Sequence, residues 1–387
     1  MIGSAGRFGS VFPHVAGATN VKEIGMAMGS MTRRSMLGML GAAGLSLAAC
    51  GGSSSGTETE ASSDASSDAG AVSTEDAKVE MVTDTGGVND QSFNELAWKG
   101  LQDLRDENGW EVSYIESKQE ADYATNLDKA VDDDATVIWG IGYAMSDAVN
   151  TAADQNPDVL FGSIEGSNDS GISNLVAVAF KSHESSFVVG YIGACMSESG
   201  KVGFVGGQKS AIIEQFEYGY YAGVEYANKQ KGKSVTYTGQ YAESFSDAAK
   251  GKSIAQKLIK DGCDVLFHAA GGAGVGMLEA CNDAKIYSIG VDQDQSKLFP
   301  DSVITSALKK VDVAVVSVTK GLIDGSVKGG QNLVLGAAED AVGIAETHDK
   351  LPDDVYQEAL DLFDAIKNGE IEVPDTKETF DAYVKSL

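Results

Sequence analysis

Two aromatic residues stand where a ring can bind a ligand instead of filling a core. Phe93 lies in NDQSFNE and Phe245 in YAESFSD, each after a serine, among polar residues and at the predicted start of a helix. Two phenyl rings that face each other across a cleft can stack on both faces of a flat heterocycle, at about 1–3 kcal/mol per ring. The alternative is a hydrophobic staple, in which each ring packs against the first turn of its own helix.

Two glycine-rich segments are similar to phosphate-binding motifs but depart from them. GFVGGQKS (203–210) follows a predicted strand as a P-loop does, yet Gln208 stands where that loop needs a glycine before its lysine. GGAGVG (271–276) has the spacing G-x-x-G-x-G, which differs from the dinucleotide fingerprint. The second segment therefore lets the backbone approach a ligand closely at a helix N-terminus, or it forms a plain tight turn.

The sequence offers no catalytic or metal-binding set. His268 lies in the apolar run LFHAA, as a satisfied core histidine does, and the sequence shows no poised pair of a histidine and an acid. No GxSxG nucleophile elbow lies between a predicted strand and a helix, and there is no CxxC pair or Cys/His cluster. We therefore predict no enzyme activity, no metal and no cofactor. Three cysteines lie in the predicted folded body, Cys195, Cys263 and Cys281; we favour reduced, buried thiols over a Cys263–Cys281 disulfide.

The elements that must position the polar residues alternate along the chain. Short apolar runs such as VEMV, TVIWGIG, LVAVAF and VLFHAA are each followed by a turn and, in most cases, a helical stretch, with helix starts predicted near Ser92, Tyr123 and Ser146. This alternation is typical of α/β proteins with parallel sheets covered on both faces. Ligands bind such sheets at the carboxyl ends of the strands, where four strands carry polar or aromatic residues, so one convergent cleft is expected.

The first fifty residues have the layout of an export signal. Arg33 and Arg34 precede an uncharged apolar stretch from Met36 to Ala49, which is too short to span a membrane and leads into Leu47-Ala48-Ala49-Cys50, a match to the bacterial lipobox. We predict that residues 1–50 are an upstream extension plus a lipoprotein signal peptide, with acylation at Cys50. Residues 51–77 are rich in Ser, Thr, Gly, Asp and Glu, and are predicted to form a disordered tether.

The composition of the chain limits which kinds of binding partner are expected. The 387 residues include 57 Asp plus Glu against 29 Lys plus Arg, for a net charge of -28. Nucleic acids and anionic lipid surfaces attract positive fields, so neither is expected as a main partner. The length suffices for two domains of about 150 residues. We expect a monomer, attached to the outer face of the cell membrane through the lipid on Cys50.

Several segments together resemble the basic membrane protein family of ABC-transporter substrate-binding lipoproteins, whose best-understood members bind purine nucleosides. They include VTDTGGVNDQSFNELAWKGL, SFSDAAKGK, HAAGGAGVG, GVDQDQ and TSALKKVDVAV, in that order. The resemblance implies a type I periplasmic-binding-protein fold: two doubly wound parallel-sheet lobes, joined by a three-crossing hinge. Lobe I is expected to comprise 78–183 plus 304–330, and lobe II 184–303 plus 331–387.

The same resemblance implies roles for seven residues. Phe93 and Phe245 would stack on the base, Asn94 would hydrogen-bond its edge, and Gly271 would let the chain approach the ligand. Asp84, Asp292 and Lys309 would hold the ribose hydroxyls; Lys309 is preferred to Lys310 because it follows TSAL in register, and Glu165 stands where the family usually has an aspartate.

The function implied is capture of a nucleoside, purine favoured, outside the cell, by hinge closure, with delivery to ABC permease subunits. The alternatives are a binding protein for a sugar or other small polar ligand, and a ligand sensor that signals to a membrane receptor. A secreted enzyme is disfavoured.

Overall fold

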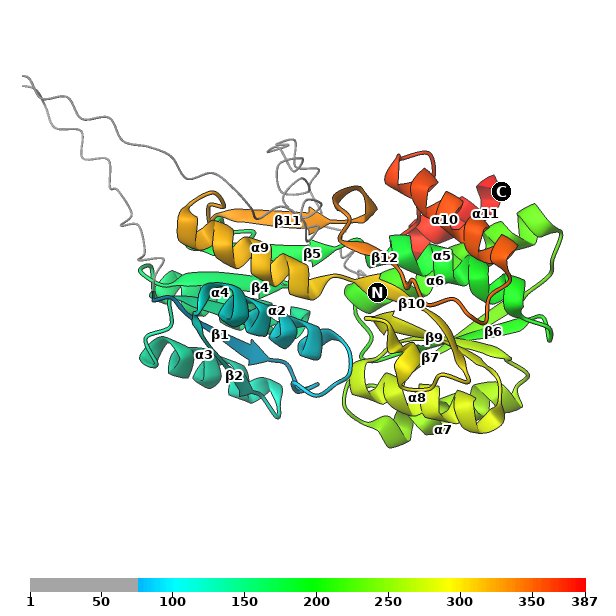
Figure 1. Cartoon of the computed structure of the whole chain (residues 1–387), viewed down its shortest axis with the longest axis horizontal. Coiled ribbons are helices and arrows are strands. Elements are labelled where there is room, and N and C mark those ends of the chain that lie inside the picture. Colours follow the sequence, from blue (N-terminus) through cyan, green and yellow to red (C-terminus); the bar gives the residue numbers. More distant parts are fainter. Residues whose placement is uncertain (1–75) are drawn as a thin grey trace, which may run out of the picture.

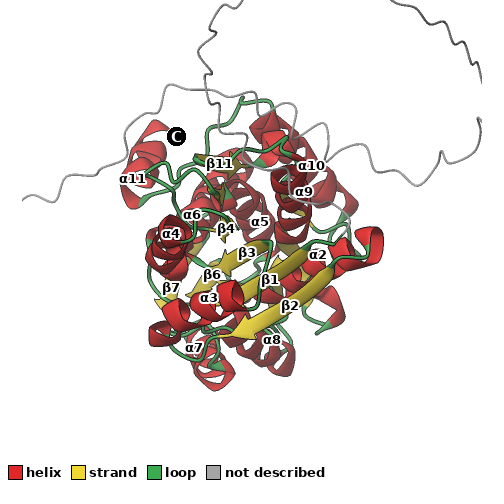
Figure 2. Ribbon diagram, turned by 90° about the vertical axis from the view of Figure 1, so that its left-hand side faces the viewer, coloured by secondary structure: helices red, strands yellow, loops and turns green. Residues whose placement is uncertain are grey.

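The computed structural model describes residues 76–387 and contains two six-stranded sheets. The first sheet has the order β11-β5-β4-β3-β1-β2, and all its strands are parallel. Figure 2 shows β3, β1 and β2 of this sheet side by side. Its strands are β1 (Lys78–Thr83), β2 (Glu111–Glu116), β3 (Val137–Ile141), β4 (Leu160–Ile164), β5 (Leu175–Phe180) and β11 (Gln331–Leu335).

The second sheet repeats the arrangement, with the order β12-β10-β9-β8-β6-β7. All its neighbours are parallel except β12, which runs antiparallel to β10. Each sheet with its covering helices forms one lobe, and the two lobes lie side by side in Figure 1. The strands are β6 (Lys201–Gly206), β7 (Thr236–Tyr241), β8 (Val265–Ala269), β9 (Tyr287–Asp292), β10 (Val303–Lys309) and β12 (Val342–Ile344).

Helices cover both faces of both sheets, as the predicted alternation of strands and helices requires. In lobe I, α2 packs on α9 and α3 on α4; in lobe II, α5 packs on α6 and α7 on α8. The helices of lobe I are α2 (Phe93–Asn108), α3 (Tyr123–Asp132), α4 (Ser146–Gln155) and α9 (Val311–Asp324). Those of lobe II are α5 (Ser182–Met196), α6 (Ala211–Lys231), α7 (Ala248–Lys260), α8 (Gly271–Ala284), α10 (Asp353–Lys367) and α11 (Lys377–Ser386).

Short 3-10 turns complete the described elements: η1 (Glu120–Asp122), η2 (Tyr143–Met145), η3 (Gln295–Lys297) and η4 (Ala337–Glu339). The α/β fold with two parallel-dominated sheets is the predicted one, and the predicted helix starts near Ser92, Tyr123 and Ser146 agree with α2, α3 and α4. The central strands are continuous apolar runs because helices bury both of their faces.

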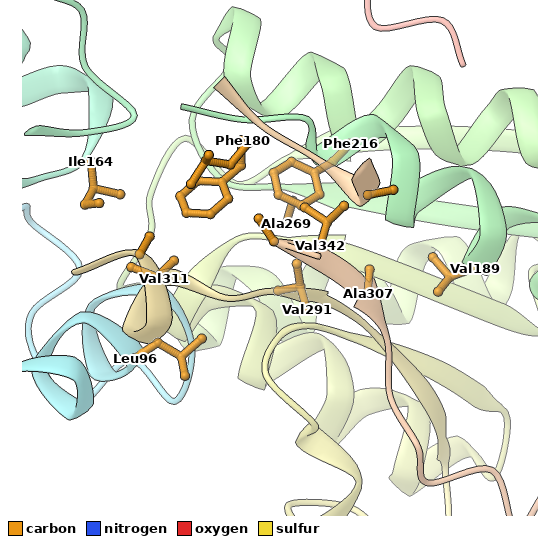
Figure 3. Close-up of a cluster of buried hydrophobic side chains, with 14 of the residues drawn as sticks. Leu96, Ile164, Phe180, Val189, Phe216, Ala269, Val291, Ala307, Val311 and Val342 are labelled. Carbon is orange, nitrogen blue, oxygen red and sulfur yellow. The ribbon is translucent and has the colours of Figure 1, made fainter. Parts of the chain in front are cut away.

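One hydrophobic cluster continues from lobe I into lobe II. It includes Leu96 on α2 and Phe180 at the end of β5, and also Phe216 on α6 and Val291 on β9. Figure 3 shows these side chains gathered where the lobes meet. Apolar packing therefore supports the junction of the lobes beneath their facing strand ends.

The chain crosses between the lobes three times: after β5, after β10 and after β11. The first two crossings have the same backbone, with φ −81° and ψ 66° at Lys181 and φ −81° and ψ 64° at Lys310. Each of these residues donates its backbone N–H to the third segment, Lys181 to Leu335 O and Lys310 to Ala341 O. The hinge is thus three hydrogen-bonded segments, two of which are nearly equivalent.

The expected division into lobes differs from the structure at two strands. β10 was expected in lobe I from residue 304 onward, but it pairs with β9 in the second sheet. β11 was expected in lobe II, but it pairs with β5 in the first sheet. The physical reason is that the chain crosses after a strand has been completed, at its carboxyl end, so two of the crossings lie after β10 and after β11 instead of before them.

Three further predictions concern the start of the chain and its cysteines. The segment predicted to be a signal peptide, the predicted acylation site Cys50 and nearly all of the predicted 51–77 tether lie outside the described residues. Within residues 76–387, no helix is both long enough and apolar enough to cross a membrane. Cys195, Cys263 and Cys281 are free thiols, the last two buried.

Candidate functional site

A cavity of about 510 Å³, counted with its open mouth, lies between the carboxyl ends of the strands of the two lobes. The residues that line the cavity come from both lobes, and small-molecule sites are common at the junction of two domains. All seven residues singled out in the sequence line it: Asp84, Phe93, Asn94, Phe245, Gly271, Asp292 and Lys309.

The loop from β1 to α2 forms the lobe I wall. Asp90 accepts hydrogen bonds from the backbone N–H groups of Ser92 (2.9 Å), Asn94 (2.9 Å) and Glu95 (3.1 Å), and so caps the N-terminus of α2. The Asn94 side-chain nitrogen donates to Asp84 Oδ1 at 2.9 Å and to Asp90 Oδ2 at 3.0 Å. Burial raises the pKa of Asp84, and it raises the pKa of Asp90 to about 6 despite the donors around that carboxylate.

A buried lysine lies between two carboxylates at the base of the cavity. Lys309 Nζ, at the end of β10, donates to Glu165 Oε1 at 2.9 Å and lies 3.8 Å from Asp292 Oδ1. Desolvation lowers the pKa of Lys309, whereas the two carboxylates raise it, and the net shift is upward. The lysine therefore stays charged, and Glu165, which stands where the family usually has an aspartate, is its direct partner across the lobes.

Aromatic rings come into the cavity from both lobes. Phe93 is the first residue of α2 in lobe I, and Phe245 precedes α7 in lobe II. The Lys309 ammonium lies 4.7 Å from the centroid of the Phe93 ring and 5.0 Å from that of Phe216. Tyr143, after β3, meets Phe245 edge to face at 6.5 Å between ring centroids.

The glycines that resembled phosphate-binding motifs make room for Phe245. A Cβ atom on Gly207 would lie 2.2 Å from Phe245 Cε1, so any side chain at position 207 would displace the ring. Gly271 has φ +52°, and a Cβ atom there would lie 3.1 Å from the Phe245 carbonyl oxygen. GFVGGQKS and GGAGVG therefore share one role here, which is to seat an aromatic residue at the cavity.

Four polar contacts join the lobes around the cavity. Ser92 Oγ donates to Asp292 Oδ2, and Gln295 Nε2 donates to the backbone oxygen of Gln91 at 2.8 Å. More distant contacts are Gln293 to Glu95 at 3.5 Å and Tyr143 to Gln208 at 3.4 Å. With the Lys309–Glu165 pair, these bonds describe lobes drawn together over the cavity.

Three buried oxygens that face this region have no hydrogen-bond partner among the described residues: Asn94 Oδ1, Glu165 Oε2 and Asp292 Oδ1. All three are acceptors. A buried acceptor without a donor costs about 1–3 kcal/mol, so these atoms favour a ligand that brings N–H or O–H groups to them.

Comparisons with known proteins agree with this geometry. Residues 77–377 match the Bmp family model, described as ABC transporter substrate-binding protein PnrA-like. The chain belongs to the Bmp family.

Relatives cover nearly the whole body of the chain. A CD4+ T-cell-stimulating antigen of Listeria innocua is 37% identical over 88% of this chain and 97% of its own length. The ABC transporter nucleoside-binding protein BmpA of Lactococcus lactis is 36% identical over 81% of this chain and 93% of its own length. A solved solute-binding protein of an Aeropyrum pernix ABC transporter system superimposes with a TM-score of 0.73, at 25% identity over 80% of this chain and 98% of that one.

Membership of this family settles two predictions. The chain is a substrate-binding protein of the ABC-transporter type, and such proteins are not enzymes. The resemblance seen in the sequence motifs is confirmed as well.

Sequence reasoning missed Asp90, Tyr143 and Phe216, which also line the cavity. Tyr143 carried a signal, since it follows the strand run TVIWGI at its carboxyl end, where the other site residues were found. Asp90 lies in the same loop as Asp84 and Asn94 but reads as an ordinary helix cap. Phe216 lies inside the apolar face of α6, so nothing in sequence separates it from core residues.

His268 is buried as predicted but only half satisfied. Its Nε2 atom lies 3.0 Å from Gln295 Oε1, whereas Nδ1 has no partner among the described residues. Burial lowers the pKa of His268 to about 4, so the ring is neutral at pH 7. Because Gln295 Oε1 also accepts from the Val291 N–H at 3.0 Å, the amide nitrogen of Gln295 is left to reach Gln91 of lobe I.

Proposed function

We propose that this chain captures a nucleoside, purine favoured, and delivers it to the permease of an ABC importer. The observation that carries the proposal is that Phe93 and Phe245, from different lobes, line one cavity together with Asp84, Asn94 and Asp292. Rings on two sides of a cavity suit a flat base, and carboxylates suit the hydroxyl groups of a ribose.

The unpartnered acceptors argue for a ligand with several donors. In the proposed complex, the ribose hydroxyls donate to Asp84 and Asp292, and the base presents an N–H group to Asn94. Lys309 Nζ lies beside Asp292 and Glu165 and supplies a donor to a ribose oxygen. A ligand that leaves these buried groups unpaired is rejected strongly, which is how such a site becomes selective.

The charge of the cavity disfavours phosphorylated ligands. Four carboxylates line it, those of Asp84, Asp90, Glu165 and Asp292, and Lys309 is the one ammonium among the residues that line it. A phosphate brought into this site would meet a net negative field. We therefore propose a nucleoside in preference to its nucleotide.

Hinge closure traps the ligand. The three segments near 181, 310 and 336–341 join the lobes at one side, and the interlobe bonds of Ser92, Gln295 and Lys309 form only when the lobes are together. A ligand that touches both lobes binds the closed arrangement better and shifts the population toward it. The closed pair of lobes is then the form presented to the permease.

The location follows from the start of the chain. We propose that Cys50 is acylated and that the body is displayed on the outer face of the membrane, at the end of a tether that ends near residue 77. Stable attachment needs more than one acyl chain, as in bacterial lipoproteins.

A thermal-shift panel tests the proposed function. The folded body should be melted with adenosine, guanosine, inosine, cytidine, ribose and free bases, each at about 100 times its expected dissociation constant, where binding adds roughly 2.7 kcal/mol of stability. We expect purine nucleosides to raise the melting temperature most. A rise with ribose or hexoses alone would contradict the nucleoside proposal and would leave a sugar-binding protein.

A further inference from the structure

We propose that Asp90 is a positioning residue that decides which edge of a base the cavity accepts. With Asp84, it holds the Asn94 amide so that the carbonyl oxygen, and not the nitrogen, meets the ligand. The inference rests on the proposed nucleoside ligand, and it adds a chemical requirement: the base must bring a hydrogen-bond donor to Asn94.

The orientation of the amide follows from the chemistry of its neighbours. Asn94 Nδ2 lies 2.9 Å from Asp84 Oδ1 and 3.0 Å from Asp90 Oδ2, and ionised carboxylates accept hydrogen bonds but do not donate them. The reversed amide would place its oxygen against both carboxylate oxygens. The nitrogen must therefore face the two aspartates, and Oδ1 is the atom left without a partner among the described residues.

The Asp90 carboxylate is fixed in this orientation by its hydrogen bonds. Its Oδ1 atom accepts the N–H groups of Ser92 and Glu95, and its Oδ2 atom accepts both the N–H and the side-chain nitrogen of Asn94. Each oxygen therefore has two donors, and the carboxylate is 3% exposed. The cap of α2 and the orientation of Asn94 are one hydrogen-bond network.

Two further buried carboxylate oxygens also favour a ligand that carries hydrogen-bond donors. Glu165 Oε2 is a buried acceptor without a hydrogen bond among the described residues, as Asn94 Oδ1 is, and Asp292 Oδ1 has only the Lys309 ammonium, 3.8 Å away. A base that presents an acceptor to Asn94 would leave two acceptors facing each other in a buried site. Such mismatches lower affinity by about tenfold to a hundredfold.

Matched nucleosides test the donor requirement on the unmodified protein. Inosine carries an N1–H donor and adenosine an amino group, whereas purine riboside has the same ring system and sugar with no donor on that edge. By titration calorimetry, we expect inosine or adenosine to bind at least tenfold more tightly than purine riboside. Equal affinities for all three would overturn the inference.

Two variants test the part played by Asp90. Asp90→Asn places an amide donor in the network, so Asn94 loses its fixed orientation, and the preference for the better of inosine and adenosine over purine riboside should fall at least fivefold. Asp90→Ser keeps a capping oxygen for α2 but no longer holds Asn94, so the same fall in preference is expected. This second variant serves as the test if Asp90→Asn does not fold. An unchanged preference in either folded variant would show that Asp90 is a helix cap alone.

Asp264→Asn is the matched control. Asp264 also accepts two backbone N–H groups, those of Glu198 and Ser199, and one side-chain donor, Ser197 Oγ, but it lies before β8 at the opposite end of the sheet. It should lower stability and leave the preference unchanged. An equal fall in Asp264→Asn would overturn the role of Asp90, since it would trace the effect to general loosening.

If no nucleoside binds the unmodified protein, the proposed function fails as well; if nucleosides bind without discrimination, this inference alone fails.

Discussion

The loops that follow β4 and β9 occupy equivalent places in the two lobes, and they begin alike. Glu165 after β4 and Asp292 at the end of β9 both have left-handed backbone, with φ 61° and 64°, and both point a carboxylate at Lys309. Non-glycine residues adopt this conformation rarely, and it is common at functional sites. The fold thus repeats one local geometry to bring two carboxylates to one cation.

The loops differ three residues later. Asn168 turns inward and donates to Ile172 O and Leu175 O of its own lobe, at 3.0 and 2.8 Å. Gln295 stands at the corresponding place in lobe II but reaches across to Gln91 O of lobe I. One loop is closed on itself, and the other holds the lobes together.

The neighbouring strands explain why lobe II supplies this contact. Gly140 in β3 and His268 in β8 hold corresponding places, opposite Val82 and Val205 of the adjacent strands. In lobe I the helix brings Val149, whose Cγ2 lies 2.2 Å from where a Cβ on Gly140 would be. In lobe II the helix has Gly274, and a Cβ there would lie 1.9 Å from His268 Nδ1. In lobe I the space between strand and helix is filled by a helix side chain, Val149, and in lobe II by a strand side chain, His268. Only the arrangement in lobe II places a ring against Gln295.

Replacement of Lys309, the cation shared by Glu165 and Asp292, should have the largest effect on stability and binding. Lys309→Met leaves Glu165 and Asp292 buried without a counter-charge, and we expect a loss of about 3–5 kcal/mol in unfolding free energy and a loss of ligand binding. Lys310→Met, one residue along, is the control. Denaturant unfolding of both variants measures the difference, and equal losses would show that the two carboxylates do not depend on Lys309.

The buried histidine of lobe II should make its own contribution to the pH dependence of stability. The pKa of His268 is about 4 when folded and about 6.5 when unfolded. Between these values the unfolded chain binds the extra proton, so stability is present above pH 6.5 and falls as the pH drops, by about 3 kcal/mol at pH 4. His268→Gln, which can still donate to Gln295, should remove the histidine's part of this slope, so that stability falls less between pH 7 and pH 4 than in the unmodified protein. An identical slope in the variant would contradict a buried neutral ring.

Each lobe should contribute one stacking ring. Phe93→Ala and Phe245→Ala should each weaken nucleoside binding by about 1–3 kcal/mol, because each removes one face of the proposed sandwich. Calorimetry with ribose as a second ligand supplies the control, since ribose has no base to stack. Unchanged nucleoside affinity in Phe245→Ala would assign its ring to packing.

The interlobe contact of Gln295 should have the smallest of these effects. Gln295→Glu keeps an oxygen for Val291 N–H and His268 but sets its second oxygen against Gln91 O, so it should favour open lobes and weaken binding about tenfold. Small-angle scattering of the ligand-free protein should show a larger radius of gyration. Asn168→Asp at the equivalent place in lobe I should lower stability without opening the lobes; an opening of equal size would contradict the assigned difference.

Local patterns made much of this structure predictable. Buried parallel strands are apolar throughout, so VEMV, LVAVAF and VLFHAA identify themselves, and polar residues at strand ends mark the cleft. The crossings were not predictable in detail, because VITSALK in β10 would fit either sheet. Asp90 was missed because an aspartate before a helix has an ordinary capping role, and its second bond, to Asn94, appears only in three dimensions. The contact of His268 with Gln295 likewise depends on Gly274, six residues farther along.

A crystal structure of the protein grown with inosine or guanosine tests the central claim most directly. The account predicts a nucleoside in the cavity between the lobes, with its base between Phe93 and Phe245 and a base N–H directed at Asn94 Oδ1. A ligand bound away from both rings, or a base that turns an acceptor toward Asn94, would contradict it.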